Sequence, residues 1–495
     1  MKIMLAQLFS KSSNHCRVRS LVLLTLVGLL SGTPRALQAA PPEQTEVIII
    51  GAGLSGLTAA YELKKAKVPY HILEITPRVG GRVRTVTYKV KGQPDIHVDS
   101  GMEEYWESNP AVKIIEELGV PHSKSGAFSS MILQKNLVLN LEQPGDFQKK
   151  IFSPEELQGL RDFEAMVAPW IKEMRSGKPV RPELMKLKDI AFSEYLDQQK
   201  LTTRVKEWIR ISVECEMGTQ YDRISALDGL AEFGIFLGDG EPSNRVLGGN
   251  QNFTQALAKA VGMKNISVNH HVTRVNTTGD HEVEVQYLNT ENNLNGVIKG
   301  RYVICTIPLY RLFEVQFVPP LSKKKQEAIQ TQTWGSYFKS HIFLPAKAAR
   351  FWSTTNGDSM LPILSDTELG VIYDGNQGQS EPTKVLSLLT FGDTAESFNM
   401  MPQDKVTARI LAGLDKMWPG ITQEITRIEF YRFHPRAVAA WPVGRSRFDD
   451  LSNEIRKPEN SVYLAGDFTE ASHSNGATGS AIRVVKEILA DRAKK

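Results

Sequence analysis

Hydrophobic and polar positions first form a regular pattern at residue 47, where a run of β-favouring residues meets a glycine-rich turn. Residues 47–50 read Val-Ile-Ile-Ile, and Gly51, Gly53 and Gly56 follow them. Beyond the glycines, apolar residues recur at helical spacing, and a second apolar run then ends at Glu74. The pattern therefore predicts a strand, a tight turn, a helix and a second strand that ends in an acid.

This order of elements is typical of a dinucleotide-binding unit. In such a unit the first glycine permits the turn, the second lets the backbone approach a pyrophosphate, and the third lets helix and strand pack closely. We expect Ser55, at the helix start, to face the phosphates, because free N–H groups and the positive end of the helix dipole lie there. Glu74 is placed to accept hydrogen bonds from a ribose diol. An ordinary strand-to-helix turn is the alternative, and it requires neither the second strand nor the acid.

Two further stretches extend this nucleotide site. Arg78, Gly81 and Arg82 belong to a glycine pair flanked by guanidiniums, which suits a second close approach to phosphate. Near the C-terminus an apolar strand runs into Gly466 and Asp467, and a loop of small residues and an amphipathic helix follow. The two ends of the chain are therefore predicted to build one site.

The N-terminal stretch resembles the signature of FAD proteins of the flavin amine oxidase superfamily, which includes monoamine and polyamine oxidases, L-amino-acid oxidases and lysine-specific demethylases. The resemblance covers nearly all of residues 44–492. One departure is Thr76, because many members carry a basic residue there. The resemblance implies an α/β fold, with a Rossmann-like FAD-binding domain interleaved with a mixed α+β substrate domain. It also implies non-covalent FAD, because monoamine oxidases attach the flavin to a cysteine in the C-terminal third, and no cysteine follows Cys305.

Alternation between strand-rich and helix-rich patterns divides the chain into segments. A helix capped by Ser153 and helices at 192–199 and 204–217 make one stretch helix-rich and substrate-facing. We expect a signal peptide at 1–40, FAD-binding segments at 44–105, 241–318 and 431–495, and substrate-domain segments at 106–240 and 319–430.

Residues 1–40 are predicted to be a targeting segment. Four basic residues precede a short apolar core at 21–30, and small residues follow it. This order is that of a Sec-type signal peptide, and the core is shorter than the about 20 residues that a membrane span needs. We expect cleavage near Ala39 or Ala40, a periplasmic or secreted protein and no stable membrane span. An uncleaved anchor is the alternative.

The leader also accounts for the net charge. The chain has Lys+Arg 59 against Asp+Glu 55, and residues 1–40 contain five basic residues and no acid. The mature protein is therefore nearly neutral, so we expect no nucleic-acid partner. No spacing of His, Cys or carboxylates suits a metal, and none is predicted. Cys215 and Cys305 are expected to be buried thiols rather than a disulfide.

The resemblance assigns further cofactor contacts to other segments. Gly101 and Met102 lie at the strand end that meets the flavin in relatives, and Val272 is placed at a main-chain contact by the adenine. Ala477 and Thr478 belong to the C-terminal helix, whose start suits the flavin N1 and C2 carbonyl, where negative charge gathers on reduction.

Lys339 is the residue to which the resemblance assigns catalysis. It matches a lysine on a strand of the substrate lobe that points through a water at flavin N5. There it assists reoxidation by oxygen or orients the water that hydrolyses the imine. Considered alone, a strand lysine that reaches solvent is the alternative. The surrounding match, which includes Gly335, favours the catalytic role.

Two aromatic positions of related substrate pockets are not aromatic in this chain. The stretch around Trp441 resembles the WPxG run of plant polyamine oxidases, and ungapped matching puts one wall of the amine cage on Val438 and the opposite wall on Ala477. Without aromatic faces the pocket is expected to be wider, which disfavours a small monoamine. Trp441 either lines the pocket or belongs to the core.

Glu103 and Glu104 stand shortly after the glycine at which L-amino-acid oxidases carry an arginine for the substrate carboxylate. Carboxylates at a substrate site would attract a cation and repel an acid. Solvated surface glutamates are the alternative. His473 is expected to be a hydrogen-bonding loop residue rather than a base.

The resemblance implies an FAD-dependent oxidase that transfers a hydride from the carbon next to an amine to flavin N5. Its products are an imine, and from it an aldehyde, together with H2O2 when O2 reoxidises the flavin. The cofactor performs the redox chemistry, and the protein supplies position and electrostatics. Two alternatives stay open: an L-amino-acid oxidase or flavin desaturase for a bulkier substrate, and a catalytically silent flavin-binding partner protein. The sequence does not define the oligomeric state.

Overall fold

A five-stranded parallel sheet lies at the centre of the nucleotide half. Its strands follow the order β10 (Ile266–Ser267), β2 (Tyr70–Leu73), β1 (Val47–Ile50), β14 (Tyr302–Cys305) and β23 (Val462–Leu464). Every neighbouring pair is parallel, and β1 and β14 are buried along their whole length, as expected for continuous apolar runs covered on both faces. Three segments far apart in the sequence therefore supply one sheet.

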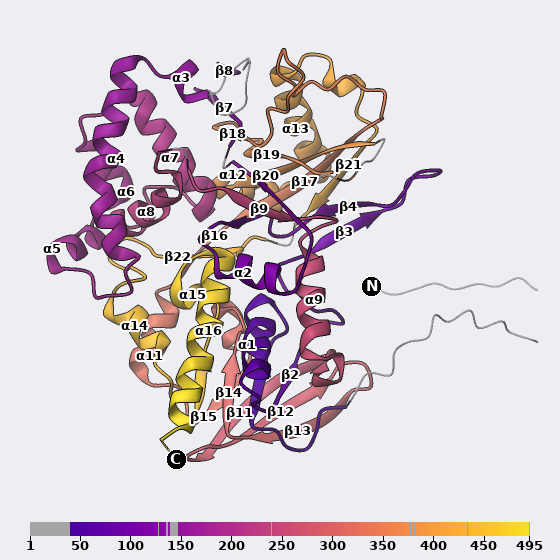
Figure 1. The fold of residues 1–495 in the computed structure, drawn as a ribbon, viewed down its shortest axis with the longest axis vertical. Coiled ribbons are helices and arrows are strands. Elements are labelled where there is room, and N and C mark those ends of the chain that lie inside the picture. The colour runs from indigo at the N-terminus through magenta and orange to yellow at the C-terminus, as the bar shows by residue number, and fades with distance from the viewer. Residues whose placement is uncertain are drawn as a thin grey trace, which may run out of the picture. The chain divides into compact units, whose positions relative to one another are not determined.

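Three helices cover one face of this sheet (Figure 1). They are α1 (Leu54–Lys65), α9 (Gln251–Val261) and α16 (His473–Arg492), and α1 packs against both of the others. Leu57 of α1, Leu257 of α9 and Val484 of α16 are buried in one hydrophobic cluster with Ile49 of β1. The C-terminal helix thus lies beside the N-terminal one.

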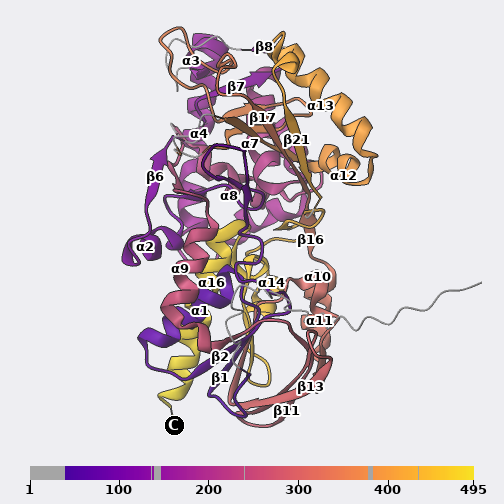
Figure 2. The same cartoon turned by 90° about the vertical axis from the view of Figure 1, so that its right-hand side faces the viewer.

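A second sheet covers the opposite face, as Figure 2 shows. Its strands are β13 (Leu294–Gly300), β12 (Glu282–Asn289), β11 (His270–Gly279) and β15 (Gln316–Val318). Val275 and Val285 of this sheet share a buried cluster with Ile48 and Val303 of the parallel sheet. This packing makes the two sheets and the three helices a layered structure.

The substrate half is built on a seven-stranded mixed sheet. Its order is β21 (Arg427–Tyr431), β17 (Tyr337–Leu344), β20 (Lys384–Phe391), β19 (Val371–Asp374), β18 (Ile363–Ser365), β7 (Ser130–Leu133) and β8 (Leu137–Val138). Helices α12 (Gly392–Met400) and α13 (Gln403–Met417) contribute to the same hydrophobic cluster as β17 and β20. All eight residues of β17, Lys339 among them, are buried.

Helices dominate the segment between β8 and β9. They are α3 (Phe147–Ile151), α4 (Pro154–Met174), α5 (Pro182–Met185), α6 (Phe192–Asp197), α7 (Thr203–Met217) and α8 (Ala226–Phe233). Ser153 caps α4 as predicted: its hydroxyl accepts the Glu156 N–H, and the Glu156 carboxylate accepts the Ser153 N–H. The helix-rich character predicted for this stretch is confirmed.

Smaller elements complete the fold. Two ribbons pair β3 (Thr85–Tyr88) with β4 (Ile96–Asp99) and β16 (Thr333–Gly335) with β22 (Val438–Ala440), and a third sheet has the order β5 (Tyr105–Trp106), β9 (Ser243–Val246) and β6 (His122–Ser125). The remaining helices are α2 (Pro110–Glu117), α10 (Leu309–Leu312), α11 (Lys323–Gln330), α14 (Asp450–Arg456) and α15 (Asp467–Glu470).

The computed structural model describes residues 40–126, 128–134, 137–138, 147–238, 240–376, 379, 383–432 and 434–494. Residues Ala39–Lys495 form one compact unit, so the boundaries proposed between the interleaved domains stay predictions. The predicted signal peptide lies outside the described residues, apart from Ala40. Within the described part of the chain, no helix combines the length and the apolar character needed to cross a membrane. The α/β architecture agrees with the sequence-based expectation.

Candidate active site

The glycine turn after β1 has the backbone geometry that its sequence predicts. Gly51 has φ of 102°, and an added Cβ would lie 2.5 Å from Thr306 Oγ1. A Cβ on Gly56 would lie 1.9 Å from the Gly51 carbonyl oxygen, so only glycine lets α1 pack this closely against the turn. At Gly53, by contrast, the nearest atom is 3.9 Å away. The turn is thus tightly packed against the protein at Gly51 and Gly56, whereas Gly53, just before α1, has free space beside it.

Glu74 lies at the end of β2 and is held beside the same turn. Its Oε2 accepts the Ala52 N–H at 2.6 Å, and its Oε1 accepts the Thr76 N–H at 2.9 Å and the Thr76 hydroxyl at 2.7 Å. Thr76 therefore orients this carboxylate. The acid, the turn and the helix start meet at the carboxyl end of the sheet, where ligands bind in open α/β sheets.

The second glycine pair lies against the first turn. Gly80 and Gly81 have φ of 105° and 56°, the Gly80 N–H donates to the Ala52 carbonyl at 2.8 Å, and a Cβ on Gly81 would lie 3.1 Å from the Gly53 Cα. Arg78 Nη2 donates to the Gly81 carbonyl at 2.5 Å, so this guanidinium stays with its own loop.

Arg82 joins this loop to the C-terminal strand. Its Nη1 and Nη2 donate to the two carboxylate oxygens of Asp467 at 2.8 and 2.6 Å. The Ala439 N–H donates to the same carboxylate at 3.1 Å. Asp467 is 1 % exposed and stands directly after Gly466, whose φ of 151° permits the sharp exit from β23. The two ends of the chain therefore meet at this ion pair, in which Asp467 is buried and Arg82 is partly exposed.

Other residues predicted to contact the cofactor lie around this pair. An added Cβ on Gly101 would lie 2.1 Å from the Arg82 carbonyl oxygen, and the Met102 N–H donates to that same carbonyl at 3.2 Å. Thr478 donates its hydroxyl to the Ser474 carbonyl within α16 at 2.8 Å. Val272 is buried between the two sheets of the nucleotide half.

Three side chains of the substrate half bind three consecutive carbonyls of the strand end 99–101. His341 Nε2 donates to the Asp99 carbonyl at 3.0 Å, His434 Nε2 to the Ser100 carbonyl at 2.9 Å, and Lys339 Nζ to the Gly101 carbonyl at 2.9 Å. Burial lowers the pKa of His341 to about 3 and that of His434 to about 4, so both imidazoles are neutral donors at physiological pH.

Lys339 is fully buried on β17 and forms an ion pair with Glu103. Glu103 is 5 % exposed and also binds Arg245 Nη2 at 2.5 Å and the Ser387 hydroxyl at 2.7 Å. Burial lowers the pKa of Lys339, while the Glu103 carboxylate opposes that shift. Lys339 therefore does not reach solvent, and Glu103 is not a solvated surface glutamate, so both alternatives raised by the sequence are wrong for these two residues.

Comparison with known proteins decides the family. The profile described as flavin containing amine oxidoreductase matches residues 54–489. The chain belongs to this family. L-amino acid oxidase Bs29 of Bothriechis schlegelii is 23% identical over 450 residues, which are 86% of each chain. Probable polyamine oxidase 4 of Arabidopsis thaliana is 24% identical over 458 residues, 88% of this chain and 85% of that protein.

A solved structure shows the same fold. Putrescine oxidase bound to putrescine superposes with a TM-score of 0.76 at 20% identity, over 91% of this chain and 100% of that one. Membership of the flavin containing amine oxidoreductase family makes the chain a flavin-dependent oxidoreductase that acts on amines, with FAD as its cofactor.

Residues of this amine oxidoreductase fit FAD on structural grounds. Ser55 Oγ is buried at the start of α1 and, among the described residues, has no hydrogen-bond partner. It lies two residues after the open position at Gly53, so a phosphate oxygen would fill the space and satisfy the hydroxyl. Gly51, Gly53, Ser55 and Glu74 would hold the nucleotide. FAD, when bound, accepts a hydride from the substrate and passes two electrons to an acceptor.

The predicted cage positions lie in different surroundings. Val438 is buried beside Tyr337 in a small hydrophobic cluster. Ala477 packs in the cluster that joins α16 to α1. Trp441 belongs to the core between the two nucleotide-half sheets, and its Nε1 donates to Ser452 Oγ at 3.2 Å. These contacts make Trp441 a core residue, which was one of the two roles considered for it.

Sequence reasoning missed a second contact between the halves. His473 is the first residue of α16, with φ of 69°, and its Nε2 lies 3.6 Å from Glu216 Oε2 of α7. It is therefore a helix-start residue in a strained conformation rather than a loop residue. The local signal in the sequence was the run of small residues around it, from Ala471 to Ser480.

Glu216 and Glu104 form an acidic region beside this contact. Glu216 accepts Trp106 Nε1–H at 3.3 Å, and Glu104 accepts the Tyr373 hydroxyl at 3.2 Å. Burial raises the pKa of both carboxyls. The charge of Glu104 further raises the pKa of Glu216, whereas for Glu104 the charge of Arg245 opposes the rise and that of Glu103 adds to it. Arg245, which lies close by, is bound to Glu103.

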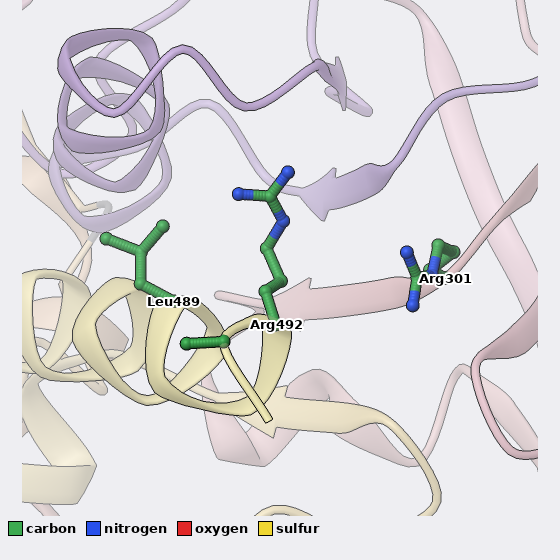
Figure 3. Close-up of a pocket in the computed structure, with 4 residues that line it drawn as sticks. Arg301, Leu489 and Arg492 are labelled. Atoms are coloured by element: carbon green, nitrogen blue, oxygen red, sulfur yellow. The ribbon is translucent and has the colours of Figure 1, made fainter. Parts of the chain in front are cut away.

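A surface pocket lies at the other end of α16, as Figure 3 shows. Arg301, Leu489, Arg492 and Ala493 line it. Arg492 is about 28 Å from His473 along the helix, at 1.5 Å per residue. Its guanidinium pairs with Glu46 at 2.6 Å. This pocket is therefore separate from the candidate active site.

Proposed function

We propose that this enzyme oxidises amines carrying a second positive charge, with O2 as the electron acceptor and H2O2 as a product. The observation that carries the proposal is the buried Glu216 carboxyl beside His473, because burial and the neighbouring Glu104 and Glu232 all raise its pKa. Within the described part of the chain, the groups that stabilise its charge are the neutral side chains of Trp106 and Cys215. A substrate ammonium would supply the missing compensation.

The reaction balances with water and oxygen as co-reactants. The C–H bond next to the nitrogen breaks with loss of a hydride, and the nitrogen loses a proton to leave an imine. Two electrons and two protons convert O2 to H2O2, and water hydrolyses the imine to an aldehyde and ammonia. The amine that reacts must be neutral, so the charge that Glu216 attracts belongs to a second amino group.

The protein's own residues position and shield the reacting groups. Glu216 and Glu104 bind the distal ammonium, and the burial of this region excludes bulk water. Lys339 is assigned to the water that hydrolyses the imine or to the reoxidation step. Its contact with the Gly101 carbonyl supports this role, because that strand end is the one expected at the flavin.

Amines are favoured over amino acids as substrates because two buried arginines are already paired with carboxylates. An L-amino acid needs a free guanidinium for its carboxylate. Arg245 is bound to Glu103, and Arg447 is bound to Asp228 at 2.7 Å and to Glu232 at 2.6 Å. An L-amino-acid oxidase is the second candidate, because such an enzyme from Bothriechis schlegelii is among the relatives.

Two further features belong to the proposal. FAD is held without a covalent bond, which is supported by the cysteine positions, since no cysteine follows Cys305 in the sequence. The protein is exported to the periplasm or secreted, which is supported by the sequence pattern of residues 1–40.

The test is an assay of peroxide and ammonia release with putrescine, benzylamine, L-leucine and L-lysine. Both products from putrescine, with less from benzylamine and none from L-leucine, are expected. Release from the L-amino acids alone would favour the second candidate. A flavin that dithionite reduces, but that none of the four compounds reduces, would indicate a silent flavin protein.

A further inference from the structure

Glu103 is held at more points than a substrate-binding carboxylate would be. Its side chain binds Lys339, Arg245 and Ser387, and its carbonyl accepts Asn250 Nδ2–H at 2.7 Å and Arg245 Nε–H at 3.4 Å. Backbone and side chain are therefore both fixed in place. The Glu103 carboxylate is therefore not free to reorient toward a ligand.

In the buried cluster around Glu103, positive charges outnumber negative ones. One carboxylate lies between two cations, Lys339 and Arg245, and all three side chains are at most 12% exposed. These cations lower the pKa of Glu103 to about 2 against the opposing effect of burial, so Glu103 is ionised at every working pH. Charged or titratable groups around Lys339 are Glu103, Asp99, Arg245, His341 and His434. Glu103 is the carboxylate in direct contact with it.

We propose that Glu103 is a positioning residue that holds the Lys339 ammonium charged and directed at the Gly101 strand end. Arg245 and Ser387 anchor Glu103, and Glu103 anchors Lys339. Without the carboxylate, Lys339 would be buried beside Arg245 with a like charge and no direct counter-ion. The inference rests on the role proposed for Lys339.

This proposal replaces the substrate role that the sequence indicated for Glu103. A carboxylate bound to two cations and a hydroxyl cannot also compensate a substrate ammonium. The neighbouring Glu104 keeps that possibility, because it accepts a hydrogen bond from neutral Tyr373. The two adjacent glutamates therefore have different roles.

The first test measures the pair without using catalysis. Thermal unfolding midpoints are compared for the wild-type protein, E103Q, K339M and the double variant, each with and without FAD. Each single substitution should lower the midpoint, and the double variant should lose less than the two losses combined. Additive losses would show that the two side chains are not coupled and would overturn the proposal.

The second test follows reoxidation of the reduced flavin by O2 against pH, after reduction by dithionite so that no substrate is needed. In E103Q, the high-pH limb that reports Lys339 deprotonation should move to lower pH, because the ammonium has lost its counter-charge. We expect a shift of about one pH unit or more, which is a tenfold change in the protonation equilibrium of Lys339. E103D keeps the charge and should return most of that shift. The double variant should be no slower than K339M.

A matched control removes a carboxylate from another buried lysine. Lys325, with a 1% exposed side chain, lies 3.8 Å from Glu459, which precedes β23 at the amino end of the parallel sheet. E459Q should leave the pH profile unchanged. If K339M slows reoxidation and E103Q keeps the wild-type pH profile, the positioning role of Glu103 is wrong, while the role proposed for Lys339 stands. If K339M itself has no effect on reoxidation, the reoxidation role of Lys339 fails, the hydrolysis role is left, and this inference is then decided by the thermal unfolding comparison.

Discussion

Arg82 and Asp467 are 385 positions apart in the sequence and form a two-point ion pair at 2.6 and 2.8 Å. Arg82 follows the second glycine pair, and Asp467 follows the last strand of the parallel sheet. The contact therefore closes the nucleotide site between the first and last segments of the chain. The nearby Asp467 charge also raises the pKa of Arg82, which stays a cation.

Substitution of Asp467 should weaken FAD binding. D467N leaves Arg82 without its buried counter-charge, and the loss of a charged hydrogen bond costs about 1.5–3 kcal/mol, or roughly 10- to 150-fold in Kd. Titration of the apoprotein with FAD, followed by flavin fluorescence, measures the change. R492Q is the control, because it breaks the Arg492–Glu46 pair at the far end of α16 (Figure 3). Equal FAD affinity in D467N and the wild type would contradict this account.

Gly56 should tolerate no side chain. In G56A the new Cβ would meet the Gly51 carbonyl at 1.9 Å, so the turn or the helix must move. We expect a loss of about 1–3 kcal/mol in the free energy of unfolding, together with loss of bound FAD. G159A within α4 is the control, because its nearest contact would be 3.9 Å away and alanine favours a helix by up to about 1 kcal/mol. A G56A protein as stable and as yellow as the wild type would refute the packing argument.

Glu216 should discriminate between amines by charge. In E216Q the distal ammonium of putrescine loses its carboxylate, whereas benzylamine, with one nitrogen, loses little. We expect KM for putrescine to rise by about 10- to 100-fold, as for loss of a charged hydrogen bond, with a much smaller change for benzylamine. Steady-state kinetics with both amines measure the difference. The same change for both amines would show that Glu216 does not read the second charge.

Glu214 should make stability depend on pH. Burial raises its pKa from 4.5 to about 7 despite the attraction of Arg210. A carboxyl with a raised pKa stabilises the fold at low pH, and that contribution is lost as pH rises from 4.5 through about 7. E214Q cannot ionise, so the free energy of unfolding of the variant relative to the wild type should rise by about 3 kcal/mol over this interval. Denaturant unfolding at several pH values measures it, and a constant difference would contradict the shift.

Local sequence signals were sufficient for the nucleotide half. The turn at Gly51, the acid at Glu74 and the C-terminal amphipathic helix each depend on a few consecutive residues, and the structure contains all three. That helix begins at His473, earlier than expected, because part of the small-residue run predicted as a loop is helical. Backbone requirements of this kind act within one turn or one strand. They can therefore be recognised without knowing what packs against them.

The contacts of Lys339 could not be predicted in the same way. Glu103 and Arg245 are 142 positions apart, and Gly101 and Lys339 are 238 apart. Such pairs depend on how interleaved segments pack, and no periodicity records a partner on another segment. The contact of His473 with Glu216 is of the same kind, because Glu216 lies on α7.

The central claim, that this FAD enzyme oxidises amines, is tested most directly by anaerobic absorption spectroscopy. The purified protein is mixed in turn with putrescine, benzylamine and L-leucine, and the flavin band is followed. The account predicts a yellow protein that putrescine bleaches and L-leucine does not, and whose flavin appears in the supernatant after acid precipitation. A colourless protein that takes up no added FAD, or a flavin bleached by L-leucine and by neither amine, would contradict it.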